Sequence, residues 1–406
     1  MRIAFFTDHF RPEPSAPAAH VYERCKLWSE WGHQVTVITS APNFPEGKVY
    51  DGYKNRLLTI EIMDGIKVLR VKTFIVPNEG FFLRTLDYMS YTVSASILTL
   101  LEPKPDVVVS TSPHLFVPLA GVIYSSMKAV PHVFEIRDLW PASVVSTTGM
   151  RRGFTYRLLE KIELGLYEKS NRIIAFTSMF KRDIVERGVP EEKVDVVING
   201  ANLELFSPVE KDAEVLDTFH LHDRFIIGYL GTIGLASGLD NVIFAAELLK
   251  DTPIIFFLVG VGAIMEKLKR LTREKDLYNV VFAGRQLKED MPRFWSVCDV
   301  GLVHLRDDSV YTTVVPSKIF ESMSTGTPIL YVVPEGEGSS IVRKHNCGLI
   351  VPPERPDELA RSALKLMNDH VLREKLGRNA LEASPLYSRQ RQAEGSLNSL
   401  IKACQS

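Results

Sequence analysis

The chain has 406 residues, of which 45% are hydrophobic and 24% are charged, with 48 basic residues against 49 acidic ones. This length exceeds what one ordinary hydrophobic core supports, so we expect two domains. The composition excludes a disordered, collagen-like or coiled-coil chain. A formal net charge of −1 excludes a global basic field. We therefore expect no nucleic-acid partner, and any attraction to phosphate must be local.

The four cysteines lie far apart and form no C-x-x-C pair, which argues against a zinc ribbon and a disulfide framework. We expect reduced thiols in a cytosolic protein. The first apolar run, Ile3 to Phe6, is too short for a signal peptide, and Asp8 follows it closely. No window of about 18 residues is uniformly apolar, so we predict no transmembrane helix. The expected location is the cytoplasm, with peripheral contact to the inner face of the cell membrane as one option.

Short apolar runs alternate with helical patterns along the first half of the chain. Residues 3–6 form a strand candidate, and residues 34–39 form the next one. Between them, residues 19–31 have a helical period that places Val21, Cys25 and Trp28 on one face. This strand–helix–strand unit is typical of a parallel, doubly wound sheet. The further strands predicted in this half are 67–71, 106–110, 131–135, 172–176 and 194–198.

A second series of strands follows a turn signal at residues 199–202. The predicted strands are 225–231, 254–260, 280–283, 300–303, 328–332 and 348–351. We therefore predict two Rossmann-like α/β domains, residues 1–205 and 206–385, that face a central ligand cleft. A helix is predicted over residues 357–377, and Pro385 separates it from a last helix within 386–406. We expect that last helix to pack back onto the first domain.

The segment from Tyr311 to Leu330 carries the most chemical information. A proline precedes Ser317 and Lys318, which fall near the first turn of a predicted helix, and Glu321 follows on the same face. Backbone N–H groups at a helix start attract anions, and Lys318 adds a positive charge there. Glu321 could accept hydrogen bonds from sugar hydroxyls. The alternative is a capped helix with a solvated Lys–Glu pair.

Glycine turns follow several strands of the second half. Gly231, Thr232 and Gly234 lie between a strand and a helix, where backbone amides can approach a phosphate. A glycine turn is a weak signal by itself, because such turns are common. Arg285 follows another strand and could pair with a diphosphate or simply cap the strand edge.

In the first half, small residues that include Ser15 and Ala16 follow the first strand and leave room for a ligand, although a rigid proline loop is the simpler interpretation. Glu135 and Asp138 stand at the carboxyl edge of a predicted strand, where open sheets bind ligands. A structural salt bridge is the alternative for these two acids. His114 follows another strand, but most lone histidines are not catalytic.

Several chemistries are excluded by the sequence. No His, Asp or Glu cluster has metal-ligand spacing, so we predict no metal and no cofactor. Neither a G-x-S-x-G elbow nor a P-loop is present, which argues against an α/β hydrolase and a P-loop NTPase. A helix with few charges is predicted over residues 81–101. This helix is either buried in the first domain or lies in a membrane interface, with Phe81, Phe82, Tyr88 and Tyr91 as anchors. The pair Arg151–Arg152 is a weaker candidate for membrane contact.

Taken together, the motifs resemble those of a retaining family 4 glycosyltransferase of the GT-B fold, in the branch that builds bacterial surface polysaccharides such as O-antigen and capsule. The resemblance covers nearly the whole chain. The matching segments include PEPSAPAAHVYE, VFEIRDLWPAS, INGANLELF, GYLGTIGLASGLDNV, CDVGLVHL and PSKIFESMSTGTPIL, and they occur in the family's order.

The resemblance implies a nucleotide-sugar donor in the second domain and an acceptor mainly in the first. Glu321 matches the second acid of the family's E-x7-E motif and would hold the nucleotide ribose, whereas the first acid is replaced by Thr313. The implied diphosphate site consists of Ser317, Lys318, Gly231, Thr232 and Gly234, with Arg285 and Leu287 beside the base. Asp138 and Glu135 would lie near the reacting carbon. The family's usual arginine and lysine in the glycine turn are absent here.

The function implied is transfer of a sugar, most simply from a UDP-sugar, to a hydroxyl of a growing, lipid-linked glycan, with retention of configuration. The predicted catalytic residues are Asp138, Lys318 and Glu321; Ser15, Ala16 and Glu135 complete the acceptor side. The acceptor would be a glycan or a polyprenyl-diphosphate-linked saccharide. Two alternatives stay open: a non-catalytic relative that scaffolds polysaccharide assembly, motivated by the missing acid and cations, and a GT-B sugar-nucleotide epimerase.

Overall fold

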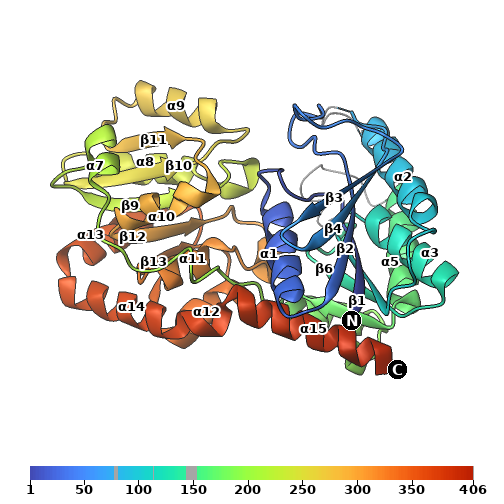
Figure 1. Ribbon diagram of the computed structural model, residues 1–406. Helices are drawn as coiled ribbons and strands as arrows, with labels where there is room; N and C mark the ends of the chain where they lie inside the picture. The colour runs from blue at the N-terminus through green and yellow to red at the C-terminus, as the bar shows by residue number, and fades with distance from the viewer. Residues whose placement is uncertain (77–80, 113, 143–152, 406) are drawn as a thin grey trace. The chain divides into compact units, whose positions relative to one another are not determined.

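The computed structural model describes the whole chain except residues 77–80, 113, 143–152 and 406 (Figure 1). The chain forms two compact units. The N-unit comprises residues 1–198 and 390–406, and the C-unit comprises residues 199–389. Each unit is built on one largely or wholly parallel sheet, so the predicted α/β class with two Rossmann-like domains is confirmed.

The N-unit contains an eight-stranded sheet in the order β3-β4-β2-β1-β5-β6-β7-β8. The β3–β4 pair is antiparallel, and the other neighbouring pairs are parallel. Its strands are β1 Arg2–Phe6, β2 Gln34–Ser40, β3 Leu58–Met63, β4 Ile66–Val71, β5 Val107–Thr111, β6 His132–Ile136, β7 Arg172–Ala175 and β8 Val194–Val196. Its helices are α1 Ala16–Glu30, α2 Phe81–Leu98, α3 Phe116–Lys128, α5 Phe154–Lys169, α6 Ser178–Glu186 and, from Gln390 onward, α15 Arg389–Gln405.

Alternating residues of the N-unit strands face two different cores. One core joins Phe5 and Val37 to the buried face of α1, including Val21, Cys25 and Trp28, as the helical period predicts. The other joins Phe6, Ile38 and Leu69 to α2 and α3. Helix α15 completes the first core, because Ala393 and Leu400 pack into it and the Ala393 carbonyl accepts a hydrogen bond from Trp28 Nε1 at 2.9 Å.

The C-unit contains a six-stranded parallel sheet in the order β11-β10-β9-β12-β13-β14. Its strands are β9 Phe225–Leu230, β10 Ile254–Val259, β11 Val280–Gly284, β12 Val300–His304, β13 Ile329–Val332 and β14 Gly348–Val351. Its helices are α7 Ala213–Phe219, α8 Asp240–Leu248, α9 Met265–Glu274, α10 Met291–Ser296, α11 Lys318–Ser324, α12 Glu337–His345, α13 Pro356–Asn368 and α14 His370–Ala383. Fully buried β-branched and aromatic residues of β9 and β10 form the centre of its core.

The unit boundaries lie a few residues from the predicted ones. The segment 199–206 joins the C-unit because the Ala201 N–H donates to the Tyr387 carbonyl and Arg389 donates to Asn199 Oδ1. The helix predicted over 357–377 is two helices, α13 and α14. They separate at Asp369, whose side chain accepts the N–H of Leu372 and so begins a new helix.

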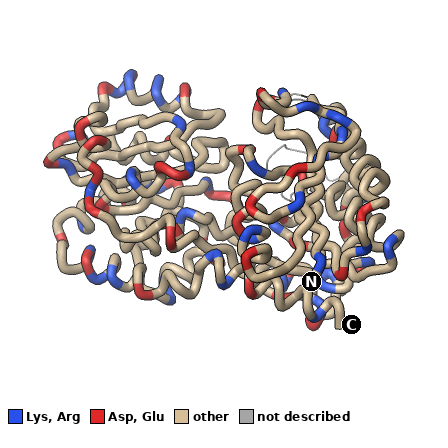
Figure 2. The backbone as a smooth tube through the Cα atoms, viewed as in Figure 1, with Lys and Arg blue, Asp and Glu red and all other residues tan. Residues whose placement is uncertain are grey.

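Strand β3 was not predicted from the sequence. It is an edge strand that exposes Ile60 and Ile62, and it pairs with β4 through a tight turn at Asp64–Gly65. No helix in the described part of the chain is long and apolar enough to cross a bilayer. Basic and acidic residues are interspersed over both units (Figure 2).

Candidate functional site

The strand order of the C-unit creates a switch point between β9 and β12. Strands β9, β10 and β11 extend the sheet in one direction, and β12, β13 and β14 extend it in the other. In open parallel sheets, ligands bind outside the carboxyl ends of the strands at such a point. The glycine turn that begins at Gly231 follows β9, and Arg306 lies two residues beyond β12.

The glycine turn is held by a second turn that follows β10. The Gly231 N–H donates to the Val259 carbonyl at 2.8 Å, and the Ile233 N–H donates to the Val261 carbonyl at 3.0 Å. A Cβ at Gly260 would overlap the carbonyl oxygen of Gly231. Gly231 and Gly260 have φ angles of +140° and +141°, a conformation that only glycine adopts readily. The two turns therefore need glycine at both positions.

Lys318 begins α11 and lies directly beside the glycine turn. Its Nζ is 3.4 Å from the ring centroid of Tyr229, and a Cβ built on Gly231 would lie 3.2 Å from the same atom. Within the described residues, no carboxylate pairs with this ammonium group. The charge therefore lies over the turn without neutralisation, which suits binding of an anion.

Glu321 lies one helical turn after Lys318 and is half-buried. Its Oε2 accepts a hydrogen bond from Trp295 Nε1 at 3.3 Å. Burial raises the pKa of its carboxyl, against the opposing effects of Lys288, the Trp295 hydrogen bond and Lys318. Lys288, which the sequence did not indicate, thus lies close enough to act on the carboxylate.

The other predicted donor residues lie around this centre. The carbonyl of Ser317 accepts the N–H groups of Phe320 and Glu321 at the start of α11. Thr232 is exposed, and its carbonyl accepts the Tyr229 hydroxyl. Gly234 precedes a short 3-10 turn over residues 235–237. Arg285 and Leu287 follow edge strand β11 and are exposed.

His304, at the end of β12, positions the glycine turn and was not among the predicted site residues. Its Nδ1 is 2.8 Å from the Ser237 carbonyl oxygen and its Nε2 is 3.0 Å from Asn241 Nδ2. Burial lowers its pKa to about 4, so the ring is neutral and donates through Nδ1. It ties the glycine turn to β12. The sequence signal was a histidine that ends a buried strand.

The N-unit has its own switch point, between β1 and β5. Asp8 follows β1 and His114 follows β5, and His114 Nε2 lies 3.2 Å from Asp8 Oδ2. The imidazole stacks on Tyr88 of α2 with ring centroids 3.7 Å apart. Its Nδ1 is buried and has no hydrogen-bond partner within the described residues. A histidine that the sequence ranks low is therefore central to this edge.

His9 extends the cluster. Its Nδ1 lies 2.7 Å from Glu13 Oε2 and its Nε2 lies 3.9 Å from Asp8 Oδ2. Burial would lower the pKa of His9, but the bond to Glu13 and the charges of Asp8 and Asp87 raise it to about 8. Burial and the Asp8 charge raise the pKa of Asp87 to about 7. The only sequence signal for Asp8 and His9 was the polar end of the first strand.

Asp138 and Glu135 lie at the same edge but have different surroundings. Burial raises the pKa of Asp138, whose carboxylate has no hydrogen bond within the described part of the chain. Glu135 is fully buried, forms an ion pair with Arg24 at 2.5 Å and accepts the Thr111 hydroxyl at 2.9 Å. These contacts are those of a structural salt bridge, the alternative interpretation for this acid.

Ser15 and Ala16 form the start of α1. The Ser15 side chain caps the helix by accepting the Ala18 N–H at 3.2 Å, and Ala16 is exposed. Arg151 and Arg152 lie outside the described residues. Within those residues, no group of three His, Cys, Asp or Glu side chains could hold a metal ion.

Comparison with known families identifies the chain. The family model described as Glycosyltransferase Family 4 matches residues 18–205, and the one described as Glycosyl transferases group 1 matches residues 212–383. The two matches cover most of both units, and Asp138, Lys318 and Glu321 lie within them. The chain is a GT-B glycosyltransferase.

Individual relatives agree with this assignment. A protein named as a colanic acid biosynthesis glycosyl transferase, WcaI of Escherichia coli strain K12, is 26% identical over 337 residues, which span 80% of this chain and 82% of the relative. Sucrose-phosphate synthase from Thermosynechococcus elongatus has a TM-score of 0.77 at 18% identity, with 99% of this chain and 98% of that one covered. Anabaena HepE in complex with UDP has a TM-score of 0.72 at 14% identity, covering 99% and 100%. The structural matches establish the fold.

In this GT-B glycosyltransferase, Gly260→Ala should destabilise the C-unit, because the new Cβ would overlap the Gly231 carbonyl oxygen. We expect a loss of about 3 kcal/mol or more. Gly284→Ala is the matched control: Gly284 also has a positive φ, +71°, but open space around its Cβ position. It should cost only about 1 to 2 kcal/mol. Thermal unfolding followed by circular dichroism measures both, and equal losses would contradict the close approach.

Proposed function

We propose that this glycosyltransferase moves a sugar from a nucleotide diphosphate sugar, a UDP-sugar first, to a hydroxyl of a growing, lipid-linked surface polysaccharide, with retention of configuration. The C-unit would hold the donor, and the N-unit the acceptor. The UDP in the HepE structure and the naming of WcaI for colanic acid biosynthesis support these choices. The observation that carries the proposal is the unneutralised Lys318 ammonium over the Gly231 turn.

The difficult step in this reaction is departure of the diphosphate. As the bond between the anomeric carbon and the β-phosphate oxygen breaks, negative charge grows on the diphosphate. Lys318 and the backbone amides around Gly231 and Gly234 would stabilise this charge. Arg285 would add a second cation from the exposed loop after β11. Because Lys318 has no carboxylate partner in the described structure, its charge need not be released from an ion pair first.

Glu321 would bind the ribose of the nucleotide. A carboxylate accepts hydrogen bonds from two neighbouring hydroxyls, and the Trp295 bond fixes its orientation. Leu287 would lie beside the base, and Ser317 and Thr232 beside the phosphates. These residues would orient the donor so that binding energy positions the anomeric carbon for attack.

The acceptor hydroxyl would bind at the carboxyl edge of the N-unit sheet. Asp138 has a carboxylate that is free to accept this hydroxyl, whereas Glu135 is occupied by Arg24. Ser15 and Ala16 would border the acceptor. In the retaining path, the acceptor oxygen bonds to the anomeric carbon on the face that the diphosphate leaves. Its proton passes to the departing phosphate oxygen, so the step needs no enzyme nucleophile.

Lys318→Ala should reduce UDP release from UDP-glucose by roughly 100-fold, because the developing charge loses its cation. Glu321→Gln should raise the donor KM with a smaller loss of turnover. The assay measures slow UDP release without an acceptor, and circular dichroism confirms that the fold is intact. Lys344→Ala, an exposed lysine on α12, is the matched control and should keep the wild-type rate.

The same assay separates transfer from the scaffolding alternative. That alternative is motivated by Thr313, which occupies the position of the family's first acid and donates only to the Val310 carbonyl of its own turn. A scaffold would bind UDP-glucose without releasing UDP in any variant. Near-normal release in both Lys318→Ala and Glu321→Gln would contradict the site assignment.

We also propose that the N-unit contacts an anionic membrane surface through α2 and α3. Leu86, Met89, Val93 and Ile97 are exposed at helical spacing on α2, and Ile123 and Met127 are exposed on neighbouring α3. Arg84 and Lys104 flank this face without an ion-pair partner among the described residues. A lipid-linked acceptor would be reached from such a surface.

The aromatic anchors predicted for this contact are partly wrong. Tyr91 is fully buried and donates to the Ile38 carbonyl, because it belongs to the core between α2 and the sheet. Tyr88 stacks on His114 instead of facing lipid. The side chains of Phe81 and Phe82 are outside the described structure. The aliphatic residues of α2 therefore carry the proposed contact.

Replacing Val93 and Ile97 together by glutamate should reduce sedimentation with phosphatidylglycerol vesicles by about tenfold, because apolar area and charge attraction are both lost. The control exchanges Leu248 and Val371, which are exposed to a similar degree on the C-unit, for glutamate. If vesicle binding drops equally in both double variants, net charge alone governs it. That result would contradict a membrane contact through α2 and α3.

A further inference from the structure

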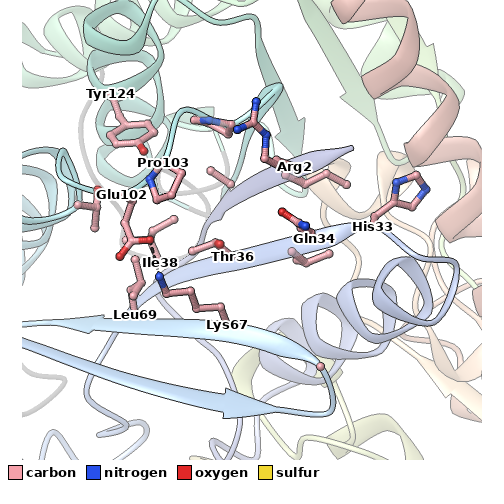
Figure 3. Close-up of a pocket in the computed structure, with 16 residues that line it drawn as sticks. Arg2, His33, Gln34, Thr36, Ile38, Lys67, Leu69, Glu102, Pro103 and Tyr124 are labelled. Atoms are coloured by element: carbon pink, nitrogen blue, oxygen red, sulfur yellow. Dashed lines mark hydrogen bonds and ion pairs between the residues drawn. The ribbon is translucent and has the colours of Figure 1, made fainter.

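A separate cavity of about 370 Å³ opens at the amino edge of the N-unit sheet, the edge opposite to Asp8, His114 and Asp138 (Figure 3). The first residues of β1, β2 and β4 form its floor. The connection from α2 to β5 and Tyr124 of α3 form its other walls. This size falls in the range of small-molecule sites. None of its lining residues belongs to the donor or acceptor site described above.

The floor changes from apolar to polar along one face of the sheet. Phe6, Ile38 and Leu69 pair side by side across three strands and are buried under α2 and α3. One step closer to the amino ends, the paired residues on the same face are Ala4, Thr36 and Lys67. Helices α2 and α3 cover the apolar row and Ala4, whereas Thr36 and Lys67 are only partly buried. The small Thr36 side chain leaves the space of the cavity beyond the apolar row.

The charges that line the cavity are paired within the protein. Lys67 Nζ lies 2.5 Å from Glu102 Oε2, and Arg2 Nη2 lies 3.1 Å from Asp106 Oδ1. Burial and the neighbouring N-terminal ammonium lower the pKa of His33, so its ring is neutral at neutral pH. Among the described residues, each charged side chain that lines the cavity is therefore paired with an opposite charge, so the lining does not favour a strongly charged ligand.

Polar groups without partners converge on this space. The Tyr124 side chain is only 2% exposed, lines the cavity, and its hydroxyl has no hydrogen bond in the described structure. The Thr36 hydroxyl and the Gln34 amide also lack partners within the described residues. In Figure 3, Thr36, Gln34 and Glu102 project toward the same space. Gln34 is exposed and Thr36 is half-buried, so these groups are open to the cavity and available to hydrogen-bond a polar, uncharged ligand.

We propose that this cavity binds a neutral hexose unit. The hydroxyls of a pyranose would pair with Tyr124, Thr36, Gln34 and the Lys67–Glu102 pair, and its C–H face would contact the exposed ring of Pro103. The structure thus assigns a second carbohydrate site to the N-unit, away from the reacting hydroxyl. The chemistry of the cavity is independent of the proposed function. Only the assignment of the hexose to the growing glycan rests on that function.

Ligand-observed saturation-transfer NMR tests this site with the methyl glycosides of glucose, galactose and N-acetylglucosamine, each in the presence of UDP. We expect transfer to at least one glycoside in the wild-type protein. Thr36→Val and Tyr124→Phe should each reduce it about fivefold, because each removes one hydroxyl and little volume. Thr59→Val, the same exchange on β3 outside the cavity, is the matched control and should leave the signal unchanged.

Two results would overturn the proposal. One is the absence of transfer to all three glycosides in the wild-type protein. The other is a signal that persists in Thr36→Val and Tyr124→Phe but disappears in Asp138→Asn, since the sugar would then occupy the acceptor edge. Melting temperatures check that each variant is folded. If Tyr124→Phe does not fold, the Thr36→Val variant alone decides the test.

The experiments distinguish a failure of the hexose site from a failure of the proposed transferase function. If UDP release depends on Lys318 but glycoside binding ignores Thr36 and Tyr124, the transferase assignment stands and this site is wrong. If the wild-type protein releases no UDP while glycoside binding requires Thr36, the site stands and the proposed function fails.

Discussion

The close approach of two glycine turns at the carboxyl end of β9 and β10 is the constraint on which the C-unit site depends. The Gly231 carbonyl occupies the space that a Cβ at Gly260 would need, and both residues have φ angles near +140°. His304 ties the following residues to β12. With the turn fixed in this way, Lys318 lies beside it and holds an ammonium group next to the Gly231 backbone.

The N-unit also has a switch point in its sheet, but different residues lie at it. Its switch point carries a series of alternating acids and histidines, Glu13, His9, Asp8 and His114, where the C-unit carries glycine and lysine. The pKa of His9 is raised to about 8, whereas burial lowers that of His114. The two histidines therefore differ in charge at neutral pH. One edge carries a lysine beside a glycine turn, and the other carries a linked set of acids and histidines.

The sequence predicted the parts of this arrangement that are local. Continuous apolar runs identified the buried parallel strands, and the spacing of Ser317, Lys318 and Glu321 identified the start of α11. It could not predict contacts that depend on strand order. Asp8 and His114 are 106 residues apart and meet only because β1 and β5 are neighbours. The sequence left Glu135 available for a ligand because its ion-pair partner, Arg24, is far away in the sequence, on α1. Strand β3 was not predicted because it lies at the sheet edge and exposes Ile60 and Ile62, so it lacks the apolar pattern of a buried strand.

Amide hydrogen exchange with and without UDP tests most directly the central claim that the donor binds at the C-unit switch point. The account predicts new protection in the glycine turn from Gly231 to Gly238 and at the start of α11 around Lys318, because a bound diphosphate would occupy those amides and slow their opening. Protection confined to the N-unit edge around Asp8 and His114, with the glycine turn unchanged, would contradict it.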